Sequence, residues 1–146
     1  MMAKYRSHTM NSIPVPALDN DVRTWLRLEG VAALIAGIAV FGRLGGDWPW
    51  LVPAILLVDV STVGYLRGPR VGAIIYNLAH QWAVALALLG AGLALNLPIL
   101  ALGGAVVVAH VGMDRALGYG LKLPTDFRDT HLGQIGRDRA EPAGGI

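Results

Sequence analysis

Four ionisable side chains interrupt stretches of the sequence that are otherwise almost entirely apolar: Asp59, His80, His110 and Asp114. Carboxylate oxygen and imidazole nitrogen are ligands that suit Zn, Mn or Fe, and the chain has no cysteine that could offer a thiolate instead. A charged side chain near the centre of a bilayer costs roughly 2.5–3.5 kcal/mol on insertion scales, so such groups are usually paired or functional. These four residues are therefore the first candidates for a site.

Local spacing adds further polar groups to the same stretches. His110 and Asp114 are four residues apart and share one face of a helix, and Tyr76 and Asn77 lie four and three residues before His80. Such hydroxyl and amide groups could orient a ligand, and basic groups nearby could hold a phosphate headgroup. The predicted metal ligands are Asp59, His80, His110 and Asp114. The predicted catalytic residues are these four together with Asn77. The predicted substrate-binding residues are Glu29, Arg67, Tyr76, Arg115 and Lys122.

The composition indicates a membrane protein. Of the 146 residues, 54% are hydrophobic and only 15% are charged, whereas charged residues make up about 25% of a typical soluble domain. The net charge is +2, and the basic residues form no single stripe, so we predict no nucleic-acid partner. Membrane lipid is the predicted partner.

Four apolar segments have the length of about 20 residues that a membrane helix needs. They lie at about residues 25–44, 48–66, 70–95 and 97–119, and Gly, Asp, Asn and Pro residues typical of turns separate them. Residues 71–95 contain no charged side chain, which excludes the charged outer stripe of a soluble helix. The sequence predicts an all-α fold, a four-helix transmembrane bundle with short loops over residues 23–120, between a flexible polar N-terminal tail (1–22) and a cytoplasmic C-terminal tail (121–146).

The basic residues set the predicted orientation. With four spans, both tails and the loop at Gly68 share one side of the membrane, and every Lys and Arg except Arg43 lies on or near that side. By the positive-inside rule, we predict a multi-pass protein of the cell inner membrane with both termini cytoplasmic. At 1.5 Å per residue, Asp59 and Asn77 lie about 10 Å from the cytoplasmic helix ends and His80 about 15 Å. Polar groups of separate helices are therefore predicted to meet in one layer.

Several strings of the sequence resemble a known family. They are LRLEG (26–30), DVSTVGYLRGPRVGAIIYNLAHQ (59–81), AHVGMDRALGYGLKLP (109–124) and FRDTHLG (127–133). Over residues 25–136 the chain is similar to the bacterial domain-of-unknown-function family 4260, and this resemblance implies a small integral membrane protein without assigning a reaction. The matching motif positions are Glu29, Asp59, Tyr65, Pro69, Tyr76, Asn77, His80, His110, Asp114, Arg115, Tyr119, Lys122, Thr130 and His131.

A second likeness rests on one short pattern. The HxxxD of the last apolar segment, His110 to Asp114, is similar to membrane proteins described as metal-dependent hydrolases of the inner membrane. The chain lacks the additional His-rich motif of those proteins.

Three functions are compatible with these residues. The first is a metal-dependent hydrolase that acts on a lipid-like substrate at the inner leaflet. The second is a proton- or ion-coupled small transporter or channel, which with four spans would require a homo-oligomer. The third is a purely structural bundle in which the polar groups satisfy one another. Tyr65 and Tyr119 are interpreted as interface anchors, and His131 as a solvated tail residue.

Overall fold

The computed structural model describes residues 19–136, so residues 1–18 of the predicted N-terminal tail and 137–146 of the predicted C-terminal tail lie outside the described residues. The described chain contains the α-helices α1 (Asn20–Arg43), α2 (Leu51–Val58), α3 (Pro69–Ala79), α4 (Trp82–Ala94) and α5 (Pro98–Leu117). Two 3-10 helices, η1 (Trp48–Trp50) and η2 (Asp59–Arg67), flank α2, and two short strands, β1 (Asp129–Thr130) and β2 (Gly133–Gln134), follow α5.

Four helical segments are long and apolar enough to cross a membrane: Asn20–Arg43, Trp48–Arg67, Pro69–Ala94 and Pro98–Leu117. They coincide with the four predicted spans, so the prediction of a mostly helical chain with four such segments is confirmed. The first helix begins earlier than residue 25 because the carboxylate of Asp19 caps it, accepting a hydrogen bond from the Asp21 backbone amide at 3.4 Å.

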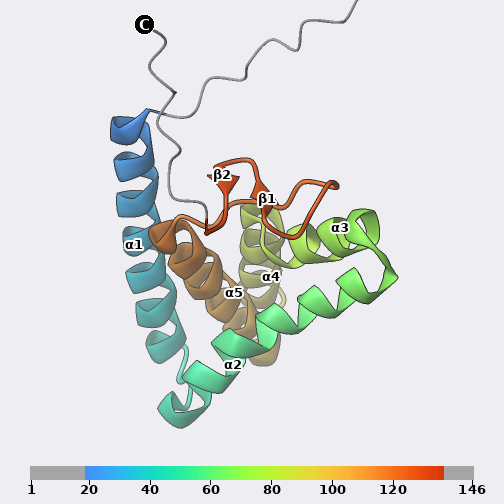
Figure 1. Ribbon diagram of the computed structural model, residues 1–146. Coiled ribbons are helices and arrows are strands. Elements are labelled where there is room, and N and C mark those ends of the chain that lie inside the picture. The colour runs from blue at the N-terminus through green and yellow to red at the C-terminus, as the bar shows by residue number, and fades with distance from the viewer. Residues whose placement is uncertain (1–18, 137–146) are drawn as a thin grey trace, which may run out of the picture.

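Helix α5 lies at the centre of the fold, and α1, α2 and α4 pack against it (Figure 1). Small residues allow this close packing. A Cβ on Gly37 of α1 would lie 2.6 Å from the backbone nitrogen of Ala109 in α5, so only glycine permits the approach beside His110. The apolar core below the polar groups consists of Phe41, Leu51, Ile55, Ala105, Val106 and Ala109.

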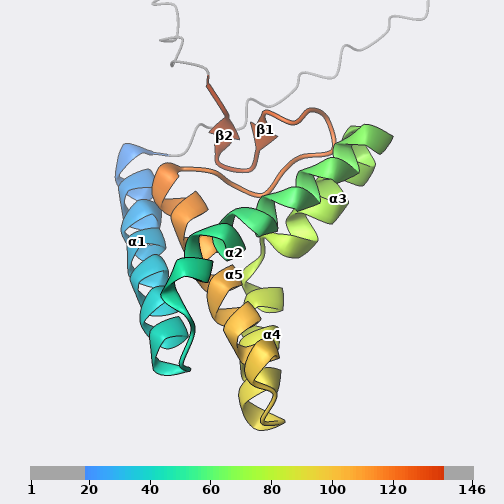
Figure 2. The same ribbon diagram turned by 90° about the horizontal axis from the view of Figure 1, so that it is seen from below.

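The start of α1, the end of α5 and the two strands lie at one end of the molecule, and the connections α1–η1 and α4–α5 lie at the other (Figure 1). From the second end, α2 and η2 run obliquely outward to α3, so the two halves of the fold diverge (Figure 2). Asp59 lies where α2 passes into η2, on the side of this diverging arm that faces α5.

The third span is not the continuous helix that the sequence predicts. Gln81 adopts an extended conformation (φ −114°, ψ 147°) between α3 and α4. The main-chain groups at this break are bonded within the protein: the His80 ring lies 2.8 Å from the Tyr76 carbonyl oxygen, and the Arg115 guanidinium donates to the His80 carbonyl at 3.2 Å. Irregular backbone inside an apolar segment needs such protein partners wherever water cannot reach it.

Residues 121–136, predicted to be part of a C-terminal tail, fold back over the end of the helices and add two short strands to the helical fold. Strands β1 and β2 form an antiparallel pair, and a further bridge joins Lys122 to Thr130. Lys122, Thr130 and Leu132 are buried. A segment predicted to be a polar tail is therefore a folded cover over one end of the helices (Figure 2).

Candidate functional site

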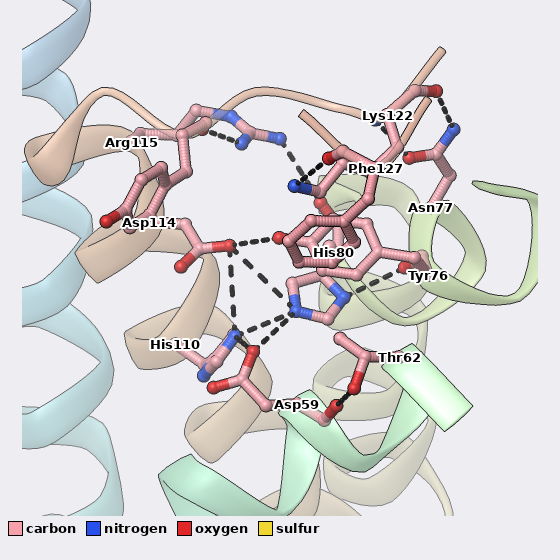
Figure 3. Close-up of polar contacts among 11 residues, drawn as sticks. Asp59, Thr62, Tyr76, Asn77, His80, His110, Asp114, Arg115, Lys122 and Phe127 are labelled. Atoms are coloured by element: carbon pink, nitrogen blue, oxygen red, sulfur yellow. Dashed lines mark hydrogen bonds and ion pairs between the residues drawn. The ribbon is translucent and has the colours of Figure 1, made fainter. Parts of the chain in front are cut away.

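Two imidazoles and a carboxylate point at one another from three helical elements (Figure 3). The Nε2 atoms of His80 and His110 are 2.9 Å apart, and Oδ1 of Asp59 lies 3.5 Å from the first and 3.6 Å from the second. Both imidazoles are fully buried, and the Asp59 side chain is 49% exposed. The predicted meeting of residues 59, 80 and 110 is thus observed.

The protonation of His80 is set by the break in the third span. Its Nδ1 faces the carbonyl oxygen of Tyr76, which can only accept, so Nδ1 carries the proton and donates. The Nε2 atom of the neutral ring therefore presents its lone pair to His110 and Asp59. The rings of Tyr76 and His80 are also stacked, with centroids 3.6 Å apart, which fixes the plane of the imidazole.

The three converging atoms have the geometry of metal ligands. The Asp59, His80 and His110 ligand atoms all lie within 4.8 Å of one another. The three distances between them define a circle of radius about 1.9 Å, so a point exists about 2.0–2.2 Å from each, which is the usual bond length of Zn to imidazole nitrogen and carboxylate oxygen. By these distances the three side chains could hold a divalent ion.

The outer ring nitrogen of His110 differs from that of His80. It is buried and has no hydrogen-bond partner among the described residues. Without an ion, His110 must donate its Nε2 proton to His80 Nε2, which leaves a buried acceptor unpaired. If His80 and His110 held an ion, both Nε2 lone pairs would face it, and the outer nitrogen of His110 would carry the proton, still without a partner among the described residues.

Asp114 lies beside the three-residue cluster and is already engaged. Its Oδ2 accepts a hydrogen bond from the Tyr76 hydroxyl at 2.8 Å and lies 3.9 Å from Nε2 of both imidazoles. Asp114 therefore joins the predicted group, but at a longer distance than Asp59. The Tyr76 hydroxyl holds the Asp114 carboxylate. Contact of Tyr76 with substrate stays a prediction.

Asn77 and Lys122 fasten the C-terminal segment to α3. The Asn77 amide donates to the Lys122 carbonyl at 2.9 Å and accepts from the Lys122 backbone amide at 2.7 Å, so both of its polar atoms are used. The Lys122 ammonium donates to the Phe127 carbonyl at 2.8 Å and lies over the Phe127 ring. Burial lowers the pKa of Lys122, and the nearby Asp114, Asp126 and Asp59 carboxylates oppose that shift.

The other predicted substrate-binding residues are placed differently. The buried Arg115 donates to the carbonyl oxygens of Tyr119 and His80, and so fixes the helix break rather than contacting the cluster. Glu29 lines a separate cavity of about 200 Å³ with Arg115 and other residues. Arg67 is exposed at the end of η2. Neither Glu29 nor Arg67 is brought to the cluster.

A pocket of about 300 Å³ gives access to the cluster from the Asp59 side. Its walls combine polar groups near the imidazoles with apolar side chains from α5 and the C-terminal segment. The residues that line it are Asp59, Thr62, Tyr76, Met113, Asp114, Leu117, Tyr119, Lys122, Phe127 and Ile135.

Several of these wall residues were not predicted. Phe127 and Ile135 come from the segment interpreted as a tail, and no periodic pattern in it indicates a cover over the site. Tyr65 packs edge-on against Phe127, with ring centroids 5.1 Å apart. Its role as an interface anchor stays a prediction. The His131 ring accepts a hydrogen bond from the Leu121 amide at 2.8 Å, so it helps to close the segment.

The fold and the cluster define a helical protein with four segments able to cross a membrane and an Asp/His group held between them. The chain belongs to the family described as domain of unknown function (DUF4260), whose family model matches residues 23–135. Comparisons with curated proteins and with solved structures found no match.

Proposed function

We propose that this protein is a membrane metalloenzyme that uses Asp59, His80 and His110 to hold a divalent ion, Zn, Mn or Fe, and hydrolyses a lipid-like substrate. The observation that carries the proposal is the convergence of the three ligand atoms around one point at metal-bond distance. Imidazole and carboxylate ligands suit these three ions. The buried lone pair of His80 supports the proposal further, because its orientation is set by the bond at Nδ1.

The site resembles a catalytic rather than a structural metal centre. Structural zinc sites are closed by four protein ligands, whereas catalytic sites keep a position open for water or substrate. Here three ligands converge, and the side chain of Asp59 is half exposed toward the pocket. A bound divalent ion supplies Lewis-acid polarisation and lowers the pKa of water in the open position.

The residues around the cluster can complete a hydrolysis. Asp114 lies 3.9 Å from both imidazoles, where its carboxylate can take the proton of the attacking water and return it to the leaving oxygen. The water oxygen forms the new bond, and the bond to the leaving oxygen breaks. Tyr76 holds the Asp114 carboxylate in place through the hydrogen bond of 2.8 Å.

The pocket and the basic residues support a lipid-like substrate in the inner membrane. Apolar side chains such as Met113, Leu117 and Ile135 line the pocket beside Lys122. Arg43 lies at the end of α1 opposite the strands, whereas Arg23 and Arg27 lie in the first turns of that helix. This charge distribution supports cytoplasmic termini by the positive-inside rule.

Metal analysis of the full-length protein tests the proposal. Protein purified in detergent without chelators is expected to contain stoichiometric metal, and Asp59→Ala and His110→Ala to contain none. His131→Ala is the matched control, because it removes an imidazole outside the cluster and should retain the metal. Circular dichroism of each variant separates metal loss from unfolding. A folded, metal-free wild type after incubation with Zn, Mn or Fe, or metal retained in folded His110→Ala, would refute the proposal.

Ion-coupled transport by a homo-oligomer is the second candidate, and the break in the third span favours it. Discontinuous membrane helices often line ion sites in transporters, and His80 lies at such a break. Vesicles that contain the protein distinguish the two functions. Hydrolysis of a fluorogenic lipid ester that requires the metal supports the enzyme, and pH-dependent solute flux by metal-free protein supports the transporter.

A further inference from the structure

A larger pocket lies on the part of the fold where α2 and η2 diverge from α4 and α5 (Figure 2). Its volume is about 620 Å³, compared with about 300 Å³ for the pocket beside Asp59. Its walls come from α2, the start of η2, the end of α3, α4 and the first half of α5. We call it the apolar groove, and the residues that line it are Ala54, Leu57, Val58, Ser61, Ala79, Val84, Leu88, Ile99, Leu102, Gly103, Val106 and Val107.

The lining of the groove suits hydrocarbon and little else. Ser61 is the one polar side chain among the described residues that line it, and none of these residues is charged. The protein leaves the groove uncovered, because Leu57 is 68% exposed and Ile99 is 88% exposed. All of its walls belong to segments that are long and apolar enough to cross a membrane. Within a bilayer, its occupant is therefore a hydrocarbon chain rather than water.

Two walls of the groove lead directly to residues of the Asp/His cluster. Val58, at the end of α2, lines the groove, and the next residue is Asp59. Ala79, at the end of α3, also lines the groove, and the next residue is His80. The groove thus reaches the cluster at the two places where the second and third spans supply their ligand atoms.

Helix α5 shows that the cluster lies between the groove and the pocket beside Asp59. His110 follows Val106 by four residues and Val107 by three, so it continues the stripe of α5 that lines the groove. Met113 and Leu117 come next on this stripe, and both line the pocket beside Asp59. At 1.5 Å per residue, His110 is about 4.5 Å along the helix axis from Val107 on one side and from Met113 on the other.

We propose that the apolar groove holds the hydrocarbon chain of an acyl ester, while the pocket beside Asp59 holds the polar part of the same molecule. This inference rests on the proposed function and narrows its substrate class to esters of long-chain acids. The ester carbonyl then lies at the cluster. Water oxygen bonds to the carbonyl carbon, the bond from that carbon to the ester oxygen breaks, and the released alcohol takes the proton. The fatty acid remains in the groove, and the alcohol leaves through the pocket beside Asp59.

The size of the groove favours a hydrocarbon chain over a helix from a second copy of the protein. The groove residues of α5, from Ile99 to Val107, extend over about 12 Å of the helix axis. An α-helix is about 10–12 Å across with its side chains, so a 12 Å length fills about 900–1,400 Å³. That volume exceeds the 620 Å³ of the groove. A single hydrocarbon chain is much narrower than a helix and fits.

The polar residue of the groove supports an ester in particular. Ser61 lies two residues after Asp59, at the cluster end of the groove. Its hydroxyl oxygen is buried and has no hydrogen-bond partner within residues 19–136. A hydroxyl without a partner in apolar surroundings is destabilising, and an acceptor brought to it removes that cost. Ester oxygens are acceptors, whereas a plain hydrocarbon offers none.

Lipid photolabelling of the metal-free, full-length protein tests the inference. The protein is reconstituted in phosphatidylcholine vesicles that contain a trace of phosphatidylcholine with a diazirine on one acyl chain. Mass spectrometry compares labelling at two places. The first is the groove, at Leu88 and Leu102. The second is the exposed face of α1, at Leu28, Val31 and Ile35. Groove labelling is expected to exceed labelling of the α1 face, because a chain held in the groove exchanges more slowly than lipid on an open face.

Gly103→Leu shows whether the groove is responsible. Gly103 lines the groove, and a Cβ on it would meet no atom within 4 Å, so the new side chain enters open space in the groove. We expect groove labelling to fall about fivefold or more, because added bulk in an occupied site acts as overpacking does in a core. Gly90→Leu is the matched control. Gly90 is a helical glycine of α4 with equally open surroundings and does not line the groove, so this variant should be labelled as wild type.

Three results would overturn the inference. The first needs no variant: a wild-type groove labelled no more than the α1 face. The second is wild-type labelling of the groove in folded Gly103→Leu, or an equal loss in Gly90→Leu, with folding checked by circular dichroism. The third is cross-linking of the groove to a second copy of the protein in place of lipid, which would assign the groove to a dimer interface.

Metal content keeps this inference separate from the proposed function. Gly103→Leu should retain stoichiometric metal, because Gly103 precedes His110 by seven residues, about two helical turns, and is not part of the cluster. Protein that binds metal but shows no excess labelling of the groove overturns the acyl groove alone. Groove labelling in protein that binds no metal overturns the metalloenzyme and leaves a groove that binds lipid chains.

Discussion

The hydrogen bond from Tyr76 to Asp114 links the third span to α5 and allows a quantitative prediction. Both residues are only 5% exposed, and the hydroxyl donates to the carboxylate at 2.8 Å. Tyr76→Phe keeps the ring stacked on His80 but leaves the carboxylate without this donor. Hydrogen bonds to charged groups contribute about 1.5–3 kcal/mol, and an unpaired buried charge costs more. We therefore expect Tyr76→Phe to lower the free energy of unfolding by about 2–3 kcal/mol.

Tyr65→Phe is the matched control for this experiment. The Tyr65 hydroxyl is buried without a hydrogen-bond partner among the described residues, so its removal should leave stability unchanged or increase it. Unfolding of both variants is followed by circular dichroism during titration of mixed micelles with SDS. The difference between the two variants isolates the bond, because each change deletes one hydroxyl. Equal stabilities for Tyr76→Phe and Tyr65→Phe would refute the reasoning.

Three further predictions concern packing and the C-terminal segment. Gly37→Ala should cost about 1–3 kcal/mol in the same SDS titration because its Cβ would collide with the α5 backbone, whereas Gly103→Ala, with open space around it, should cost nothing. Asn77→Ala should speed amide hydrogen exchange across residues 121–136, because it removes two hydrogen bonds to the Lys122 backbone. Unchanged exchange would show that these two bonds do not hold the segment in place. Burial lowers the pKa of His131 below its usual value of about 6.5. Protonation of His131 therefore opposes the folded state, and residues 121–136 should lose protection from amide hydrogen exchange as the pH falls below 6.5. The same pH dependence of exchange in His131→Ala would exclude His131 as the cause.

The central group was predictable because membrane depth can be counted along a helix. Asp59, His80 and His110 lie at similar distances from the helix ends, and helices of fixed rise that cross the same layer bring such residues together. The i, i+4 spacing likewise placed Asp114 beside His110. Span positions followed from hydropathy alone, and the structure matches them closely.

The helix break and the folded C-terminal segment could not be predicted in the same way. No proline or glycine marks residues 79–82, because the break is stabilised by Arg115, a partner more than 30 residues away. Residues 121–136 are held by the Asn77 amide and the buried Lys122 rather than by a local periodic pattern. Long-range hydrogen bonds of this kind leave no local signature, so a polar tail was the interpretation that local composition favoured.

The distribution of the cluster over three spans has a consequence for biogenesis. Asp59 precedes both of its imidazole partners in the chain, His80 by 21 residues and His110 by 51. If the segment Trp48–Arg67 enters a bilayer as it is synthesised, it does so before either imidazole is present. An aspartate at the centre of a span raises the free energy of membrane insertion by about 2.5–3.5 kcal/mol on the translocon scale. Each Leu, Ile or Val lowers it by about 0.3–0.6 kcal/mol. Residues 51–58 contain six such residues, which together offset most of that cost. In a membrane, the apolar run before Asp59 would let the carboxylate enter the bilayer ahead of the two imidazoles that it later meets.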